Sequence, residues 1–300
     1  AFQRALEMNE SEQRWRLALE GARLGVWELG GEDSAPFFSP QWLTMLGYEP
    51  NSLPQSFETW RDLLHPDDRD EALAKVNKAA AEGREQFTAT FRLRDQSGGY
   101  RWILARGKAV EFDDEGKAVR LVGIHSDVSE LKQAESELVY LAYHDQLTGL
   151  PNRKAFYEQA EQTVAQSRRA SPPAPGAVLL VDLDHFKDVN GSFGHDLGDE
   201  LLRAAADRLR EHLRGTDLLF RLGGDEYTII LTSLRTQTDA GLVASNLIRA
   251  FGDPFLLDGH TIYSSLSIGI AAYPEDGTNA AELIRNSDTA LNRAKRERAT

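Results

Sequence analysis

Residues 177–182 form a continuous apolar run that ends in an acid, and this run restricts the fold more than any other feature of the sequence. A strand that is apolar on both faces is typical of the centre of a sheet covered by helices. Further along, residues 218–222 and 227–231 flank Gly223-Gly224-Asp225-Glu226. This pattern predicts a hairpin, because glycine tolerates the positive φ of a tight turn. If the hairpin lies beside the apolar strand, acids from both segments meet at one edge of the sheet.

These acids indicate metal chemistry. Asp182 and Asp184 follow the apolar run, and Asp225 and Glu226 occupy the hairpin turn. Crowded carboxylates resist ionisation unless a cation lies between them. Hard oxygen ligands select Mg²⁺ or Mn²⁺, and such sites bind substrate phosphates and activate an attacking hydroxyl. For either pair of acids taken alone, the simpler interpretation is a solvated end of a strand or turn.

The composition is that of a soluble globular protein. The 300 residues suit two domains, with 41% hydrophobic and 27% charged residues. A formal net charge of −13 argues against a nucleic-acid partner, because phosphate contacts need clustered Lys and Arg. The lack of cysteine excludes disulfides, thiol catalysis and zinc–thiolate sites. With no signal peptide and no membrane-spanning apolar run, we expect a cytoplasmic, soluble fragment of a longer protein, whose membrane anchoring the sequence leaves open.

The N-terminal part has a short helix, residues 1–20, followed by a mainly β domain, residues 21–128. Residues 87–94 alternate apolar and polar side chains with the period of two that marks a half-buried strand. Glycine-containing turns separate this strand from two more, which predicts an antiparallel meander. The predicted strands are 25–29, 87–94, 100–110 and 118–125, and the clearest helix is 67–81.

A helical linker, residues 129–144, follows. Leu131, Ala134, Leu138 and Leu141 recur at alternating spacings of three and four, as in the seam of a coiled coil. Two heptads are too short to be stable alone, so we expect two copies held by flanking domains to pair as a parallel stalk. The alternative is an amphipathic helix that packs on its own domain.

Residues 145–300 alternate helices and strands, with a Pro-rich loop at 171–176. One predicted helix has an apolar face formed by Leu201, Leu202, Ala205, Leu209 and Leu213. A further long strand, 262–272, and a final helix, 280–298, follow. Together these segments predict a mixed sheet with helices on its faces.

Residues 11–128 resemble a PAS sensor domain. The motifs that carry the resemblance are Gly25-Val-Trp-Glu, Gly47-Tyr-Glu-Pro, His65-Pro-Asp-Asp-Arg69, Gly99-Tyr-Arg-Trp102 and Gly123-Ile-His-Ser-Asp-Val-Ser-Glu130. His125 shares the inward parity of its strand and could ligate haem, but a hydrogen-bonded core histidine is the favoured interpretation. We expect His65 to cap the next helix. Four tryptophans are expected in the core of the domain: Trp27, Trp42, Trp60 and Trp102. The sequence does not identify a ligand of the PAS domain.

Residues 140–295 resemble the GGDEF diguanylate cyclase family, with the motifs in the family's order. They are Asp145-Gln-Leu-Thr-Gly-Leu-Pro-Asn-Arg153, Asp182-Leu-Asp-His-Phe-Lys-Asp-Val-Asn190, Phe193-Gly-His-Asp-Leu-Gly-Asp199, Arg221-Leu-Gly-Gly-Asp-Glu-Tyr227, Ser267-Ile-Gly269 and Asp288-Thr-Ala-Leu-Asn-Arg-Ala-Lys295. The resemblance implies an α+β fold: an antiparallel PAS sheet with short helices, a helical linker, and a palm-like central sheet flanked by helices, residues 145–300.

The resemblance also implies roles for individual residues. Asp182 and Asp225 would ligate the metal together with the carbonyl of Leu183. Asp225 would also act as general base for a ribose 3′-hydroxyl, supported by Glu226. The remaining implied contacts are with the substrate GTP: Lys187 and Lys295 at the phosphates, Asn190 and Asp199 at guanine, and Phe186, His195, Gly223 and Gly224 around the nucleotide.

The implied reaction joins two GTP into cyclic di-GMP and two pyrophosphates. Each domain would hold one GTP, so two copies must face each other, and the PAS domain and linker would bring this homodimer together. Arg214 and Asp217 match the family's RxxD site, where cyclic di-GMP inhibits. An arginine fork suits guanine or phosphate, and an aspartate suits the donor edge of guanine.

Several positions depart from the family pattern. Tyr227 replaces Phe, Asn292 replaces Tyr, Gly191 replaces a common Asp, and Ala299 stands where the family tends to have Arg. The change at Ala299 predicts weaker triphosphate binding. It also fits the subset of the family in which a phosphodiesterase (EAL) domain follows. The alternative function is therefore a catalytically weak module that binds GTP or cyclic di-GMP and regulates an EAL domain outside this sequence.

Overall fold

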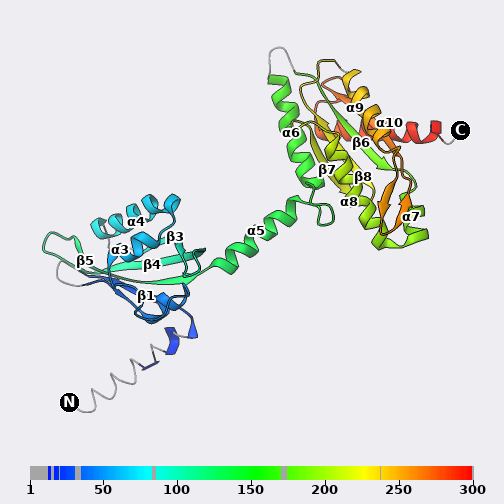
Figure 1. Cartoon of the computed structure of the whole chain (residues 1–300). Coiled ribbons are helices and arrows are strands. Elements are labelled where there is room, and N and C mark those ends of the chain that lie inside the picture. The colour runs from blue at the N-terminus through cyan, green and yellow to red at the C-terminus, as the bar shows by residue number, and fades with distance from the viewer. Residues whose placement is uncertain are drawn as a thin grey trace. The chain divides into compact units, whose positions relative to one another are not determined.

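The computed structural model describes residues 13–14, 17–19, 21–30, 35–82, 86–169, 174–236 and 238–298. The chain divides into two compact units, Ala1–Ser136 and Glu137–Thr300, each with its own hydrophobic core (Figure 1). Most of the predicted N-terminal helix, part of the predicted loop at 171–176, and Ala299 lie outside the described residues. Within the described ranges, no helix is both long enough and apolar enough to cross a membrane.

The N-terminal unit is built on a five-stranded antiparallel sheet with the order β2-β1-β5-β4-β3. The predicted meander is confirmed, because β3 pairs with β4 and β4 with β5 in sequence order. The alternation predicted for β3 is also confirmed, since its apolar positions from Ala89 onward are buried. The strands are β1 Gly25–Leu29, β2 Phe37–Phe38, β3 Phe87–Arg94, β4 Tyr100–Phe112 and β5 Ala118–Asp127.

Short helices cover one face of this sheet (Figure 1). They are α2 Pro40–Thr44, α3 Phe57–Leu63, the 3-10 turn η1 Pro66–Asp68 and α4 Arg69–Glu82. The predicted helix at 67–81 is divided, because Pro66–Asp68 forms a 3-10 turn before α4 begins. His65 caps this turn as predicted, and its Nδ1 accepts from the backbone N–H of Asp67 at 3.2 Å.

One of the four predicted core tryptophans is misplaced. Trp27, Trp42 and Trp60 are buried in the core. Trp102 is only partly buried, and the guanidinium of Arg92 lies over its ring at 5.2 Å. The prediction assumed that a large aromatic side chain would lie in the core. A pattern within one strand does not show that Arg92 of a neighbouring strand covers the ring of Trp102.

Helix α5, Ser129–Tyr143, contains no buried residue. Its seam side chains are exposed, Leu131 by 67%, Leu138 by 68% and Leu141 by 38%. The burial of the described residues therefore gives no support to the alternative interpretation, a linker helix packed on its own domain. The leucine seam of α5 is an apolar stripe that no described residue of the chain buries.

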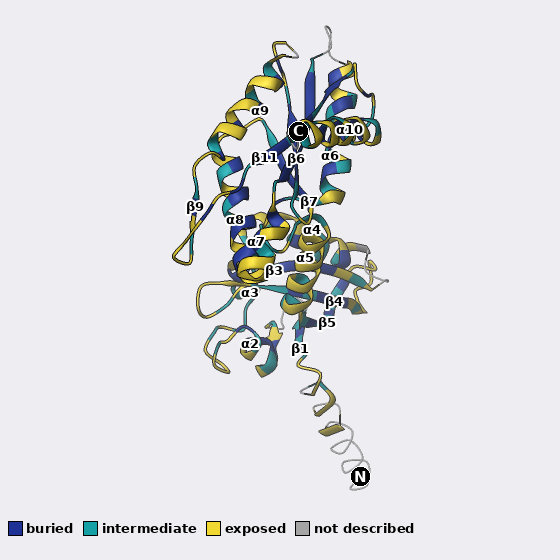
Figure 2. Cartoon of the chain, turned by 90° about the vertical axis from the view of Figure 1, so that its right-hand side faces the viewer, coloured by how far each residue is buried: buried dark blue, intermediate teal, exposed yellow. Residues whose placement is uncertain are grey.

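The C-terminal unit has a four-stranded sheet with the order β11-β6-β8-β7, in which every pairing is antiparallel. The strands are β6 Gly176–Leu183, β7 Leu218–Gly223, β8 Glu226–Leu231 and β11 Leu266–Tyr273. All eight residues of β6 are buried, which confirms the predicted central strand (Figure 2).

Helices cover both faces of this sheet, with α8 and α9 on one side and α6 and α10 on the other (Figure 2). Alternate side chains of β6 enter the two layers. Leu179 and Val181 join the core under α8 and α9, whereas Val178 and Leu180 join the core under α6 and α10. This arrangement explains why the run is apolar at every position. The helices are α6 Arg153–Arg169, α7 Phe186–Phe193, α8 His195–Glu211, α9 Thr238–Ala250 and α10 Ala280–Arg298.

The predicted long strand at 262–272 is wrong at its beginning. Ile262 ends β10 (His260–Ile262), which pairs with β9 (Phe255–Leu257) in a separate two-stranded hairpin. The turn between them is Asp258-Gly259, and both residues have positive φ, 43° and 77°. This Asp-Gly signal was visible in the sequence. Likewise, α8 ends at Glu211, so Leu213 lies beyond the helix whose face it was predicted to extend.

A substitution at Gly269 of β11 tests how closely α10 packs on the sheet. An added Cβ at Gly269 would fall on the backbone of Ser287 and Leu291 in α10. We expect Gly269→Ala to lower the free energy of unfolding of this unit by about 1–3 kcal/mol in urea denaturation. Gly191→Ala on α7 is the control. It has no atom within 4 Å of the added Cβ, and helix propensity predicts a gain of up to about 1 kcal/mol. Equal stability of the two variants would contradict this packing.

Candidate functional site

The predicted meeting of acids is confirmed by the register of β6 and β8. Asp182 of β6 lies directly opposite Glu226, the first residue of β8. The N–H of Leu183 donates to the carbonyl of Asp225 at 3.2 Å, which ties the end of β6 to the hairpin turn. Two chain segments more than 40 residues apart therefore place acids at one edge of the sheet.

Asp182 is paired with a lysine from α10. The Nζ of Lys295 lies 2.6 Å from Oδ1 of Asp182, whose side chain is only 10% exposed. Burial raises the pKa of Asp182, and the ammonium of Lys295 opposes this rise. The negative charges of Asp225 and Asp184 add to the rise. A largely buried carboxylate with other negative charges nearby is stabilised in its ionised form by a bound cation.

Asp184, the second acid after the run, is held by two serines. The hydroxyls of Ser265 and Ser267 donate to its two carboxylate oxygens, each at 2.6 Å. The backbone N–H of Asp184 also donates to the carbonyl of Ser265 at 3.0 Å. Ser265 is not among the site residues predicted from the sequence, and Ser267 was noted there only as part of a motif. The only available signal was the Ser267-Ile-Gly269 motif, which places Ser267 opposite Asp182 in the register of β11 and β6.

An open groove of about 830 Å³ runs along this edge of the sheet. We call it the acidic groove, and it contains six of the predicted site residues: Asp182, Leu183, Phe186, Lys187, Asp225 and Lys295. The other residues that line it are Asp184, His185, Asp188, Ser265 and Ser267. The remaining residues predicted for catalysis and GTP binding are not in its lining: Asn190, His195, Asp199, Gly223, Gly224 and Glu226.

The predicted guanine contacts lie on the two helices that follow β6. Asn190 is on α7, and His195 and Asp199 are on the first turns of α8. The Oδ1 of Asn190 is buried and has no hydrogen-bond partner among the described residues. It packs against Gly198, where an added Cβ would collide with it. Gly198 therefore allows α7 and α8 to approach closely at the position of Asn190.

The glycine turn is fixed by a buried arginine. Gly223 and Gly224 have positive φ of 133° and 56°, which an L side chain rarely adopts. The guanidinium of Arg221 donates to the carbonyl of Gly224 at 2.6 and 3.2 Å. It also donates to Oδ1 of Asp145 at 2.7 Å, so Arg221 links the turn that carries Asp225 to the segment after α5.

The Asp145 carboxylate is stabilised in its charged form. Its burial favours protonation, but the hydrogen bonds from Thr148 and Arg221 outweigh this effect and lower the pKa of Asp145. At the other end of the turn, burial raises the pKa of Glu226, with Arg153 opposing the rise. The guanidinium of Arg153 is 3.7 Å from the carboxylate of Glu226.

The donor atoms of the acidic groove fit a hard divalent cation as a partial ligand set. Every candidate ligand is an oxygen, from the carboxylates of Asp182 and Asp225 and the carbonyl of Leu183. In the described part of the chain, no group of three or more His, Cys, Asp or Glu side chains converges as a complete metal site. A cation held here would need further oxygens from water or a bound phosphate, as Mg²⁺ sites usually do.

Arg214 and Asp217 lie in a second groove, of about 570 Å³, between the α8–β7 connection and the start of the unit. The backbone N–H of Arg214 donates to Oδ2 of Asp217 at 3.0 Å, which closes the turn. Arg210 lines the same groove. Two arginines and a carboxylate therefore share one depression on this surface.

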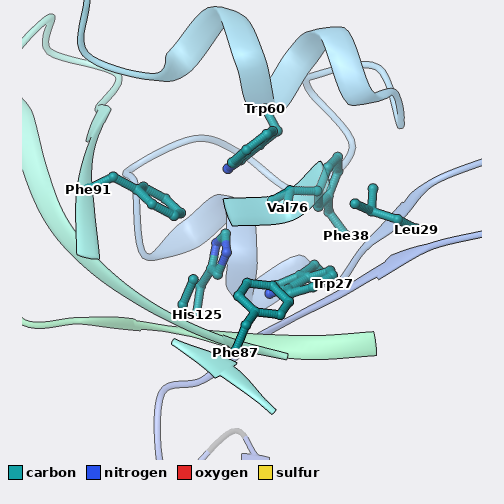
Figure 3. A pocket seen from close by; sticks show the side chains of 9 residues that line it. Trp27, Leu29, Phe38, Trp60, Val76, Phe87, Phe91 and His125 are labelled. Atoms are coloured by element: carbon teal, nitrogen blue, oxygen red, sulfur yellow. The ribbon is translucent and has the colours of Figure 1, made fainter. Parts of the chain in front are cut away.

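The cavity of the N-terminal unit confirms the favoured interpretation of His125. His125 is buried, and its Nδ1 accepts from the indole N–H of Trp42 at 2.8 Å. Burial lowers its pKa to about 3, so the ring is neutral. Figure 3 shows aromatic side chains, including Trp27 and Trp60, around His125. The cavity beside His125 has a volume of about 20 Å³, which is suited to a water-sized molecule.

Two family models match the chain. Residues 142–300 match the family described as diguanylate cyclase, GGDEF domain, and residues 35–125 match the PAS fold. The family of diguanylate cyclases uses a divalent metal.

Three curated relatives illustrate the similarity. Protein y4lL of Sinorhizobium fredii, described as uncharacterized, is 33% identical over 295 residues, 96% of this chain and 35% of its own length. The bifunctional diguanylate cyclase/cyclic di-GMP phosphodiesterase MucR of Pseudomonas aeruginosa is 42% identical over 167 residues, 56% of this chain and 24% of its own. Diguanylate cyclase TpbB of the same species is 39% identical over 170 residues, which are 56% of this chain and 39% of the length of TpbB. The chain thus spans well under half the length of each of these relatives.

A solved structure agrees with the sequence comparison. The crystallised form of TpbB that comprises only its GGDEF domain has a TM-score of 0.50 and 41% identity, covering 51% of this chain and 89% of that one. The family model matches more than half of the chain, and the matched residues include the acidic groove and its glycine turn. The chain is a member of the GGDEF family of diguanylate cyclase domains, with a PAS fold on the N-terminal side of the cyclase domain.

Proposed function

We propose that this chain condenses two molecules of GTP into cyclic di-GMP and two pyrophosphates. The observation that carries the proposal is the antiparallel register of β6 and β8, which sets Asp182 beside the turn of Asp225 in a groove that also holds Lys187 and Lys295. Acids at one end and lysines around them suit a metal-bound triphosphate. An acidic groove without the lysines would bind a cation but repel the nucleotide.

Asp182, Asp225 and the carbonyl of Leu183 are proposed to hold Mg²⁺, with Mn²⁺ as a substitute of the same ligand preference. The bound cation would supply charge neutralisation at the phosphates. Asp225, at the tip of the turn, would accept the proton of the ribose 3′-hydroxyl, and Glu226 would support it. Lys187 and Lys295 would bind the phosphate oxygens.

Asn190 and Asp199 are proposed to bind the guanine base. The carboxylate of Asp199 would accept from the N–H donors of guanine N1 and N2, and the amide of Asn190 would bind the other edge of the base. Phe186 and His195 would line this site, and Gly223 and Gly224 would allow the backbone to approach the nucleotide.

Product formation needs two copies of the chain, because each site holds one of the two nucleotides that react. The leucine seam of α5 supports a homodimer, since its side chains are exposed among the described residues. We propose that the PAS unit regulates the cyclase through this pairing. Arg214 and Asp217 would bind cyclic di-GMP and inhibit, and Arg210 lies in the same groove.

Removing the acid at the tip of the turn should abolish product. We expect Asp225→Asn to lower the rate of cyclic di-GMP formation about 100-fold or more, because the 3′-hydroxyl loses its base and the metal loses a ligand. Asp207→Asn is the matched control, since Asp207 is exposed on α8 and pairs with Arg210. Chromatography of nucleotides after incubation with GTP and Mg²⁺ gives the rates. Undiminished product in Asp225→Asn, or no product from the unaltered chain at high concentration, would refute the proposed reaction.

The seam of α5 offers a second test. We expect Leu138→Glu to weaken dimerisation and to lower the rate per chain, because like charges would face each other across the pair. The thermal stability of the units should stay within about 0.5 kcal/mol, since Leu138 is exposed in one chain. Gln133→Glu adds the same charge off the seam and should leave both properties unchanged. Sedimentation velocity at several concentrations measures dimerisation, and an unaltered dimer in Leu138→Glu would exclude the stalk.

The Asp145–Arg221 pair should make stability depend on pH. Because the folded state lowers the pKa of Asp145, the pair stabilises the fold above the unfolded pKa of about 3.9 and is lost as pH falls through the lower folded value. Asp145→Asn should therefore cost about 1–2 kcal/mol at pH 7 and show a weaker loss of stability in acid. Urea unfolding between pH 3 and 7 measures this, and parallel pH curves for both proteins would be the contrary result.

A further inference from the structure

Lys295 lies where its ammonium competes with any other cation for Asp182. Its Nζ is 2.6 Å from Oδ1 of Asp182, and the two side chains differ in exposure, 39% for Lys295 and 10% for Asp182. The carboxylate is thus fixed in the wall of the acidic groove, whereas the lysine reaches it from the open side. A long, flexible side chain that is partly exposed can leave such a pair without any change in the backbone.

The second lysine of the acidic groove differs in this respect. Lys187 lines the same groove and is exposed. Among the ion pairs of the described residues, Asp182 pairs with Lys295 and none involves Lys187. The two lysines therefore have the same charge and groove, but only Lys295 occupies an oxygen that the proposed function assigns to the metal.

We propose that Lys295 is an exchangeable counter-ion, which neutralises Asp182 before a divalent cation binds and moves to the triphosphate afterwards. This inference rests on the proposed function of the acidic groove and adds a coupling between its two ligands. Cation binding releases the ammonium of Lys295 for the phosphates, and phosphate binding removes the competitor from Asp182. By linkage, the cation and the nucleotide each strengthen the binding of the other by the same factor.

The proposal predicts effects of opposite sign when the charge is removed. In Lys295→Met, a divalent cation alone should bind more tightly, because its competitor at Asp182 is gone. The nucleotide alone should bind more weakly, because a phosphate contact is gone. A lysine that serves only as a phosphate ligand predicts an unchanged affinity for the cation, and a lysine that only stabilises the fold predicts that both affinities fall.

The test measures Mn²⁺ binding to the full chain by electron paramagnetic resonance of free Mn²⁺, without nucleotide. We expect Lys295→Met to lower the dissociation constant about two- to fivefold, the range for loss of a competing, partly exposed ion pair. The same titration with a GTP analogue whose α,β-bridging oxygen is replaced by methylene gives the coupling factor without turnover. We expect this factor to fall toward one in Lys295→Met.

Lys187→Met is the matched control, because it removes an equal charge from the same groove without freeing Asp182. Its Mn²⁺ affinity should rise less than that of Lys295→Met. Lys295→Arg keeps the charge and should retain an affinity near that of the unaltered chain, and circular dichroism shows whether each variant is folded.

The outcomes separate this inference from the proposed function. Mn²⁺ binding that is lost in Asp182→Asn but equal in Lys295→Met and Lys187→Met overturns the exchange and leaves the metal site standing. Mn²⁺ binding that persists unchanged in Asp182→Asn overturns the metal site itself, and the exchange with it.

Discussion

The antiparallel pairing of β6 with β8 is the constraint on which the structure of the C-terminal unit depends. Asp182 lies opposite Glu226 only in this register. A slip by one residue would turn every side chain of β6 to the opposite layer, because side chains alternate along a strand. The apolar residues of β6 fill both layers of the core, and its terminal acid reaches the groove. Core packing and the position of the site are therefore specified by the same pairing.

The repulsion between the acids is offset by neighbours that each act on one group. Lys295 pairs with Asp182, serine hydroxyls bind Asp184, and Arg153 lies near Glu226. Arg221 acts on the backbone instead, since it binds the carbonyl of Gly224. Several acids can therefore lie together at the end of a strand, because separate local contacts each offset part of their mutual repulsion.

Most of the fold followed from the sequence, because periodicity and turn residues are local signals. The central strand, the meander, the hairpin acids and the final helix were all visible. The errors have two causes, a tertiary contact in the case of Trp102 and an overlooked local turn signal in the case of the hairpin. Arg92 covers Trp102, and the Asp258-Gly259 turn creates an extra hairpin where one long strand was expected. The ion pair of Lys295 with Asp182 and the serines at Asp184 join distant segments, so no local pattern could predict them.

The exposed leucines of α5 have a consequence for signalling dynamics. If product arises only from pairs of chains, the output at low abundance rises with the square of the protein concentration rather than in proportion to it. A small fractional change in concentration then produces a larger fractional change in output, so a modest rise in expression or local clustering gives a disproportionate response. If two chains pair through it, the apolar stripe of one helix would thereby make the output depend on concentration more steeply than in proportion.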